Sequence, residues 1–442
     1  MIKCKLLSSP AMIQLPARAR APGPSVQNSG IIPICFELML VRRPEEQTLI
    51  CVARRSLDAG TTERLRLLLQ EPLDWDYLLA LASHHGLLPL LHQHVNSADP
   101  SAVPGPTMLR LELDNEANTK TSLFLTGELL KVLEFLEKDG IQPIPFKGPT
   151  LALRAYGDIG LRQCGDLDIL VHKKDVPRLR EILITRGFTP KPELSIGQEA
   201  ALLRFDCAYN FDNGRGVVWD VHWALVERHS AYLIDLDPLW PRREPLTIGG
   251  KELLTLSTED LLLILCLHGF THLWERLGWI CDVASLIDQQ ENIDWRLVME
   301  NANKLGLRRI LLLGLVLASE LLDASLPAEM RQAADGDAVV KRLAHQLEEQ
   351  LFREHRAPPG LFEGAILDLK MRERKRDWLR SGVRLILTPR SSDWMSLSLP
   401  ESLFFLYYLL RPVRLARKYG LQLLWGSKDR RTPTGGNGLS NS

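Results

Sequence analysis

Gly165-Asp166-Leu167-Asp168-Ile169-Leu170-Val171 forms the centre of the predicted core. Its apolar and β-branched residues, followed by a polar break at residues 172–175, predict a β-strand. Because side chains two residues apart in a strand point to the same face, Asp166 and Asp168 are expected to lie side by side. Two neighbouring carboxylates repel each other unless a cation lies between them, and Mg²⁺ binds carboxylate oxygens together with substrate phosphates. The stretch indicates either a metal–phosphate site or a strand end with solvated acids.

Three neighbouring features favour the metal–phosphate site. Lys147-Gly148 ends the preceding predicted strand, and a glycine there lets backbone N–H groups approach a phosphate. Arg162 lies in the loop that enters the aspartate strand, and Asp220 lies in a second β-branched run at residues 217–222. Three acids on adjacent strands are typical of two-metal sites that transfer phosphoryl and nucleotidyl groups.

These residues form one pattern along the chain: Lys147-Gly148, then Leu161-Arg162, the strand 166–171 and finally Asp220-Val221-His222-Trp223. The pattern resembles the uncharacterised nucleotidyltransferase family of the polymerase-β-like superfamily, over residues 45–425 in round terms. The resemblance implies an α/β (α+β) nucleotidyltransferase core with a short mixed sheet, flanked by N- and C-terminal helical regions. One departure is Pro149 after Gly148, where the superfamily usually has Gly-Ser or Gly-Gly.

The resemblance also implies an activity, which is transfer of a nucleotidyl group from an NTP to an acceptor with release of pyrophosphate. Asp166 and Asp168 are expected to bind two Mg²⁺ ions, and Asp220 to complete the metal site and help deprotonate the incoming hydroxyl. Residues expected to bind the nucleotide are Lys147, Gly148, Thr150 and Arg162. The sequence identifies neither the NTP nor the acceptor nor the oligomeric state.

Two other functions stay open at this point. Pro149 after the turn glycine is compatible with a catalytically inactive nucleotidyltransferase fold that acts as a binding or scaffold protein. A basic stretch near the C-terminus is compatible with a toxin-like nucleotidyltransferase that acts on RNA or protein.

A cleft for the acceptor is expected on the helical region after the core. The pattern from Thr258 predicts one helix that continues to Asp282, with His268, His272 and Trp279 on a shared face. For these three residues, lining a cleft is favoured over packing in a core helix. For the histidine pair, it is also favoured over binding a metal ion. His222 shares the Asp220 face of its strand, and we expect it to hydrogen-bond an acid or the acceptor.

Composition places limits on the partners. The 442 residues are enough for a large core, and their formal net charge of zero requires neither nucleic acid nor lipid as a partner. The seven cysteines form no Cys-x-x-Cys pair, which favours free thiols in a reducing cytoplasm. No apolar run reaches the ~18–20 residues that a membrane span needs.

Five regions are predicted along the chain. They are a disordered leader (1–30), an N-terminal helical region (31–140), the nucleotidyltransferase core (141–235), a C-terminal helical region (236–426) and a disordered tail (427–442). Within the core, strands are expected at residues 141–146 and 166–171, and a hairpin at residues 201–212 and 216–223. Between them, helices are expected at residues 149–156 and 176–186.

The basic stretch 370–390 precedes an aromatic run at residues 403–408. Such a combination binds nucleic acid or an anionic membrane surface in some proteins. The favoured interpretation is a solvated helix followed by a buried helix, so nucleic acid is not the favoured partner.

Overall fold

The computed structural model describes residues 42–230, 232, 234–290, 292–353, 367–373 and 375–425, with the backbone alone described at 375–377 and 418–425. The predicted leader and tail lie outside these residues, and the region boundaries stay a prediction. None of the five described cysteines, Cys51, Cys164, Cys207, Cys266 and Cys281, is in a disulfide.

The N-terminal part is helical, as predicted. Asp74 begins the helix α4 (Trp75–His85) by accepting a hydrogen bond from the backbone N–H of Tyr77, and Gly86 ends it in the left-handed conformation at φ 75°. The elements are α2 (Pro44–Val52), α3 (Ala59–Leu69), α4 (Trp75–His85), α5 (Leu88–Ala98), η1 (Pro100–Ala102) and α6 (Gly105–Lys138).

A mixed five-stranded sheet follows, with the order β1-β2-β5-β4-β3. The strands β2 and β5 are parallel, and the other three pairings are antiparallel. The elements are β1 (Ile144–Pro145), α7 (Pro149–Tyr156), η2 (Ile159–Leu161), β2 (Asp166–Leu170), η3 (Lys173–Asp175), α8 (Val176–Thr185), β3 (Thr189–Lys191), α9 (Ile196–Phe205), β4 (Ala208–Asp212) and β5 (Val218–His222). The short mixed sheet is therefore confirmed, with the Pro-containing β1 at its edge.

The two faces of the sheet differ in chemistry. Leu167 and Ile169 of β2, with Trp219 and Val221 of β5, are buried in one hydrophobic cluster with α8, α9 and the second half of α6. The alternating residues, including the three acids, lie on the opposite face. Burial of the apolar face thus fixes which way the acids point.

Two details of the core differ from the prediction. The first arm of the hairpin begins at Ala208 because Ser195 and Gln198 form a capping box that starts the helix α9. The small sheet β6–β7 was not predicted; its two strands pair around a Gly249–Gly250 turn. The connecting elements are η4 (Arg228–Ser230), η5 (Asp237–Arg242), β6 (Glu244–Ile248) and β7 (Lys251–Thr255).

The prediction of one helix that continues from Thr258 to Asp282 is wrong. The helix ends at Thr271, because Leu273 and Trp274 have positive φ angles and the Trp274 ring turns back into the core. Space for the ring exists only because residues 269 and 314 are glycines, where a Cβ would lie 2.5 and 3.1 Å from it. The elements are α10 (Thr258–Thr271), α11 (Leu277–Gln289), α12 (Trp295–Leu305), α13 (Arg308–Leu322), α14 (Ala328–Asp335) and α15 (Ala338–Gln350).

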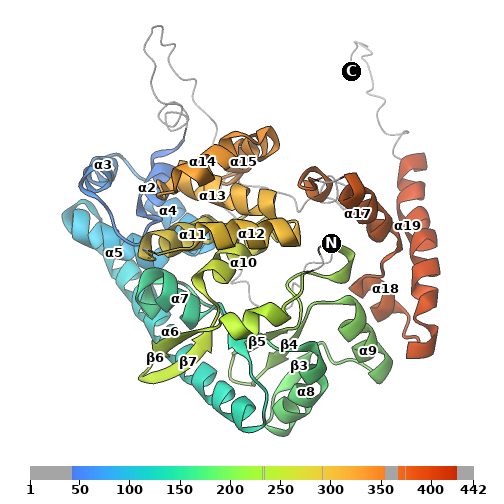
Figure 1. The fold of residues 1–442 in the computed structure, drawn as a ribbon. Helices are drawn as coiled ribbons and strands as arrows, with labels where there is room; N and C mark the ends of the chain where they lie inside the picture. The colour runs from blue at the N-terminus through green and yellow to red at the C-terminus, as the bar shows by residue number, and fades with distance from the viewer. Residues whose placement is uncertain are drawn as a thin grey trace, which may run out of the picture.

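The N- and C-terminal helical regions share one hydrophobic cluster instead of packing separately. This cluster joins α2–α5 to α10–α15 and also contains Phe146, Tyr156 and Leu170 from the acid side of the core. Figure 1 shows α10–α13 stacked above the sheet, with α3 and α5 at one edge of the molecule. The acids therefore lie between the sheet and the later helices. No described helix has both the length and the apolar composition of a membrane span.

The last described elements are α17 (Lys375–Leu387), α18 (Ser391–Ser396), η6 (Glu401–Leu403) and α19 (Phe405–Trp425). Figure 1 places them at the edge opposite α3 and α5. The helix α17 is exposed to solvent, as predicted, but its outward face carries apolar side chains such as Leu379 and Val383. The aromatic run that follows is buried only in part, at Phe404 and Tyr407. Arg374 and the side chains of Lys375 and Arg376, the centre of the basic stretch, lie outside the described part.

Candidate active site

The parallel pairing of β2 and β5 brings two of the predicted acids together. In this pairing Asp168 lies directly opposite Asp220, and Leu170 lies opposite His222. Neighbouring strands are ~4.8 Å apart, so the two carboxyl groups on the same face are within reach of one ion. The two acids are 52 residues apart in the chain, and only the fold makes them neighbours.

Asp168 is the most enclosed of the acids, with 4 % of its surface exposed. Its Oδ1 accepts a hydrogen bond from Nζ of Lys147 at 3.1 Å and lies 3.1 Å from Nε2 of His222. The structure thus places Lys147 and His222 on the same carboxylate oxygen. An ammonium group in this position neutralises the buried charge of Asp168.

Asp220 has a partner that the sequence analysis missed. The side-chain amide of Asn210 on β4 donates a hydrogen bond to Oδ1 of Asp220, and the two residues are opposite each other in the sheet. Asn210 lies between the buried residues Tyr209 and Phe211, so strand alternation places it on the acid face. This alternation was a usable signal, but only with the strand pairing known.

The proximity of the acids changes their ionisation. Burial raises the pKa of the Asp220 carboxyl to about 8, and the charges of Asp168 and Asp166 add to this effect. Burial also disfavours ionised Asp168, but the charge of Lys147 and the His222 hydrogen bond outweigh it and hold its pKa well below the usual range. Asp166 reaches the surface, yet the surrounding protein atoms and the charge of Asp168 raise its pKa as well. At neutral pH Asp168 is ionised and Asp220 is protonated.

This donor set fits a divalent cation. Among the described residues, Asp168, Asp220 and His222 form a group whose candidate ligand atoms all lie within 4.8 Å of one another. Carboxylate oxygens are the ligands that Mg²⁺ prefers, and a metal ion would replace the proton on Asp220. The carboxylate of Asp166 is outside this group, although it is on the same strand face.

The turn before α7 lies against the start of β2. Gly148 has φ 60° and ψ −136°, a backbone conformation that residues other than glycine rarely adopt. Its backbone packs so closely that a Cβ would lie 3.2 Å from the carbonyl oxygen of Asp166. Thr150 is buried, and its hydroxyl donates to the carbonyl oxygen of Lys147, so it stabilises the turn. Binding of a phosphate by Gly148 and Thr150 stays a prediction.

Replacement of the turn glycine tests this close approach. We expect Gly148→Ala to lower the free energy of unfolding by more than Gly86→Ala does, because Gly86 also has positive φ but has open space around its Cα. The left-handed conformation of Gly86 costs a non-glycine residue ~1–2 kcal/mol, and the ψ of −136° at Gly148 adds to the strain there. Thermal melts of both variants measure the difference, and nucleotide binding should weaken in Gly148→Ala alone. Equal melting temperatures with unchanged binding would show that the turn is unimportant.

The guanidinium group of Arg162 binds a carboxylate other than those of Asp166, Asp168 and Asp220. Its Nε and Nη2 bind the two carboxylate oxygens of Asp282 on α11 at 2.8 and 3.0 Å, and the hydroxyl of Tyr156 donates to the same carboxylate. The pair is buried and joins the loop before β2 to the C-terminal helices. Contact between Arg162 and a phosphate stays a prediction. No local sequence pattern indicated Asp282 as its partner.

The rings expected to line the acceptor cleft do meet, although the single helix predicted to carry them is broken. His268 and His272 have ring centroids 4.6 Å apart, and Trp279 lies 5.2 and 5.3 Å from them. The reversal at residues 272–276 brings α11 back beside α10. Burial lowers the pKa of His268 well below its usual value, and the nearby Lys147 charge adds to this, so His268 is neutral beside the acids.

The site lies within a range of the chain that matches a known family. A family model described as an uncharacterised nucleotidyltransferase matches residues 71–323, which is more than half of the chain. No curated protein matches the sequence. The matched range contains every residue of the site described above, and it confirms both the resemblance and the predicted α+β nucleotidyltransferase fold.

Proposed function

Because the chain belongs to the family of uncharacterised nucleotidyltransferases, we propose that it transfers a nucleotidyl group from an NTP to an acceptor hydroxyl. The acceptor oxygen forms a bond to the α-phosphorus, the bond from that phosphorus to the β-phosphate oxygen breaks, and pyrophosphate leaves. The proton of the acceptor hydroxyl goes to the Asp220 carboxylate.

The observation that carries this proposal is the position of Asp168 opposite Asp220 on two parallel strands. Asp166, Asp168 and Asp220 would hold two Mg²⁺ ions, which when bound stabilise the attacking and leaving oxygens of the displacement. Asn210 holds one oxygen of the Asp220 carboxyl on the β4 side through its hydrogen bond, which leaves the other oxygen for a metal ion on the β2 side. The apolar face of the sheet is fully packed, which supports a rigid placement of the acids.

The nucleotide would bind at the turn of Lys147 and Gly148, with Thr150 and Arg162 supporting it. In the structure Nζ of Lys147 is bound to Asp168, so we propose that it moves to the triphosphate once metal neutralises that acid. The acceptor would lie beside the ring cluster of His268, His272 and Trp279, with His222, which contacts Asp168, near His268. We also propose that the protein lies in a reducing compartment, the cytoplasm. The described cysteines support this, because none of them is in a disulfide.

The Lys147–Asp168 ion pair also favours a second candidate, an inactive fold whose lysine replaces the metal. A thermal-shift series with each non-hydrolysable NTP, with and without Mg²⁺, separates the two. The enzyme should be stabilised only when Mg²⁺ and NTP are both present, by about 2.7 kcal/mol at a hundredfold excess over Kd. Labelled NTP with a cell extract then identifies the acceptor. The absence of any Mg²⁺-dependent stabilisation would exclude the proposed reaction.

A further inference from the structure

The helix α17 presents its apolar side to solvent. Leu379, Val383 and Leu387, spaced four residues apart, and their neighbours Trp378 and Ile386 are 40–64 % exposed. Its inward face is polar, since Ser381 and Thr388 are only 4 % and 5 % exposed. A surface helix normally has the opposite arrangement, with its apolar stripe toward the core. The exposed face of α17 therefore indicates a surface that something else covers.

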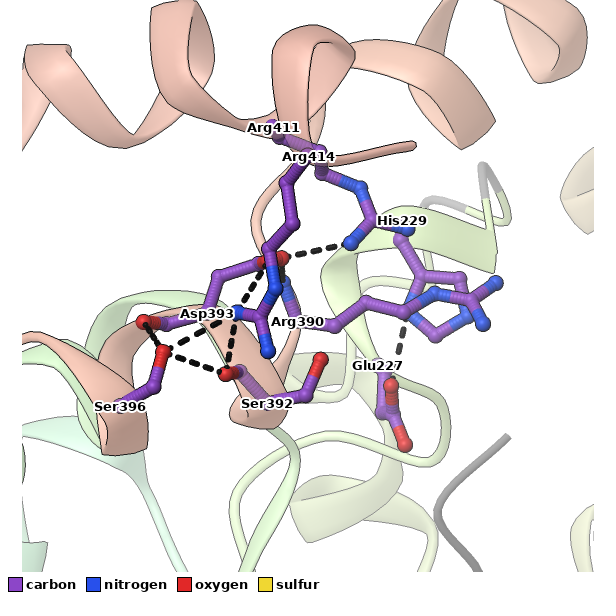
Figure 2. Close-up of polar contacts among 8 residues, drawn as sticks. All are labelled: Glu227, His229, Arg390, Ser392, Asp393, Ser396, Arg411 and Arg414. Carbon is purple, nitrogen blue, oxygen red and sulfur yellow. Dashed lines mark hydrogen bonds and ion pairs between the residues drawn. The ribbon is translucent and has the colours of Figure 1, made fainter. Parts of the chain in front are cut away.

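The helix α19, which packs beside α17, repeats this arrangement. Phe405, Leu409 and Val413, again spaced four residues apart, are 58–66 % exposed, and Leu410 is exposed beside them. Buried ion pairs fix the rotation of α19. Figure 2 shows Arg411 and Arg414 reaching Asp393 of α18, and Arg411 is bound to it at 2.5 Å with 3 % of its own side chain exposed.

These contacts hold α19 with its apolar stripe outward. Arg411 is about 160° around the helix from Leu409, so a helix anchored through the arginine must turn the leucine away from the body. Arg414 adds a 2.9 Å contact to Asp393 and hydrogen bonds to Ser392 and Ser396. The exposure of the stripe is a result of this buried anchor and not of a loosely placed helix end.

The same segment is strongly basic. Residues 367–425 contain twelve Lys and Arg but five Asp and Glu, whereas the whole chain has zero formal net charge. The rest of the protein therefore carries a matching negative excess. Arg380 and Arg417 are exposed, and they lie one residue from Leu379 and four residues from Val413. Long basic side chains at the edge of an apolar face can extend to phosphate groups while their stems cover apolar surface.

We propose that α17 and α19 form a docking surface for an anionic phospholipid membrane. An interfacial helix buries an apolar face of Trp, Phe and Leu in the lipid boundary and places basic residues at the headgroups, and this surface has both features. A second copy of the chain would bring two strongly positive faces together. Nucleic acid would account for the charge but would leave the apolar stripes uncovered. In this proposal the two helices lie in the plane of the membrane surface.

The test is co-sedimentation of the full-length protein with vesicles. We expect binding to phosphatidylcholine vesicles that contain about 30 % phosphatidylserine, weak binding to pure phosphatidylcholine, and a steep decrease with salt. Leu379→Glu with Leu409→Glu should reduce binding at least tenfold. Arg380→Glu with Arg417→Glu should reduce it on the order of tenfold or more, because each basic residue near the surface contributes about fivefold.

The matched control is Leu113→Glu on α6, since Leu113 is also 58 % exposed but lies outside the basic segment. It should bind as the wild type does. Equal binding to both vesicle types, or no binding by the wild type, would overturn the proposal. So would a dimer that the Leu379/Leu409 variant dissociates, or RNA binding that depends only on the arginines. Melting curves verify folding, and the arginine variant supplies the result if the leucine variant does not fold.

Discussion

Asp166→Asn is expected to lower the rate of nucleotidyl transfer on the order of 10²–10⁴-fold while the fold stays intact. Asp166 is exposed, and no described residue forms an ion pair with its carboxylate, so its loss removes a metal ligand without breaking a structural contact. Asp168→Asn should abolish the activity to the same degree but should also lower stability. It leaves the ammonium of Lys147, whose side chain is 13 % exposed, without its partner.

The measurement combines single-turnover rates, titration calorimetry with Mg²⁺ and NTP, and thermal melts. Asp76→Asn on α4 is the control, because its side chain is 94 % exposed and lies outside the site. Turnover and metal binding at wild-type levels in both site variants would refute the assignment of these acids. If Asp168→Asn instead binds NTP without Mg²⁺, the inactive-fold candidate gains support.

Asp220→Ala is expected to remove turnover and to retain part of the NTP affinity, since Asp166 and Asp168 would still hold the ion on the nucleotide side. His222→Ala should lower the rate far less. The two residues share a strand face, but Mg²⁺ prefers carboxylate oxygen to imidazole. In the structure His222 contacts Asp168, which fits a group that orients this acid.

The pKa of Asp220, raised to about 8 by burial and by the neighbouring acids, adds a pH test. Below this pH the carboxyl keeps its proton, and a metal ion must displace it. Mg²⁺ affinity should therefore rise with pH up to about 8 in the wild type and should lose this rise in Asp220→Ala. A crystal structure with Mg²⁺ and a non-hydrolysable NTP tests the ligand directly. A distance above about 5 Å between Asp220 and both metals, against ~2.1 Å for coordination, would show that the third acid was chosen wrongly.

Prediction from sequence succeeded where the signal is local. The two-residue period in β2 identified the strand and the shared face of Asp166 and Asp168, and the turn residues before β5 identified the hairpin. The proline at position 149 indicated the first turn of α7, which begins there. Each of these signals depends on residues within a few positions of one another, so backbone stereochemistry alone is enough to read them.

The sequence alone therefore predicts the strands β2 and β5, the glycine turn and the types of residue that carry the chemistry. Which side chains meet depends on the tertiary structure. Asp168 faces Asp220 across 52 positions, and Arg162 binds Asp282 across 120. The break after α10 depends on a tryptophan that fits beside a glycine of α13, 40 positions later. The outward apolar faces of α17 and α19 follow from buried polar anchors. Packing between distant segments determines all of these contacts, and no local period in the chain encodes such packing.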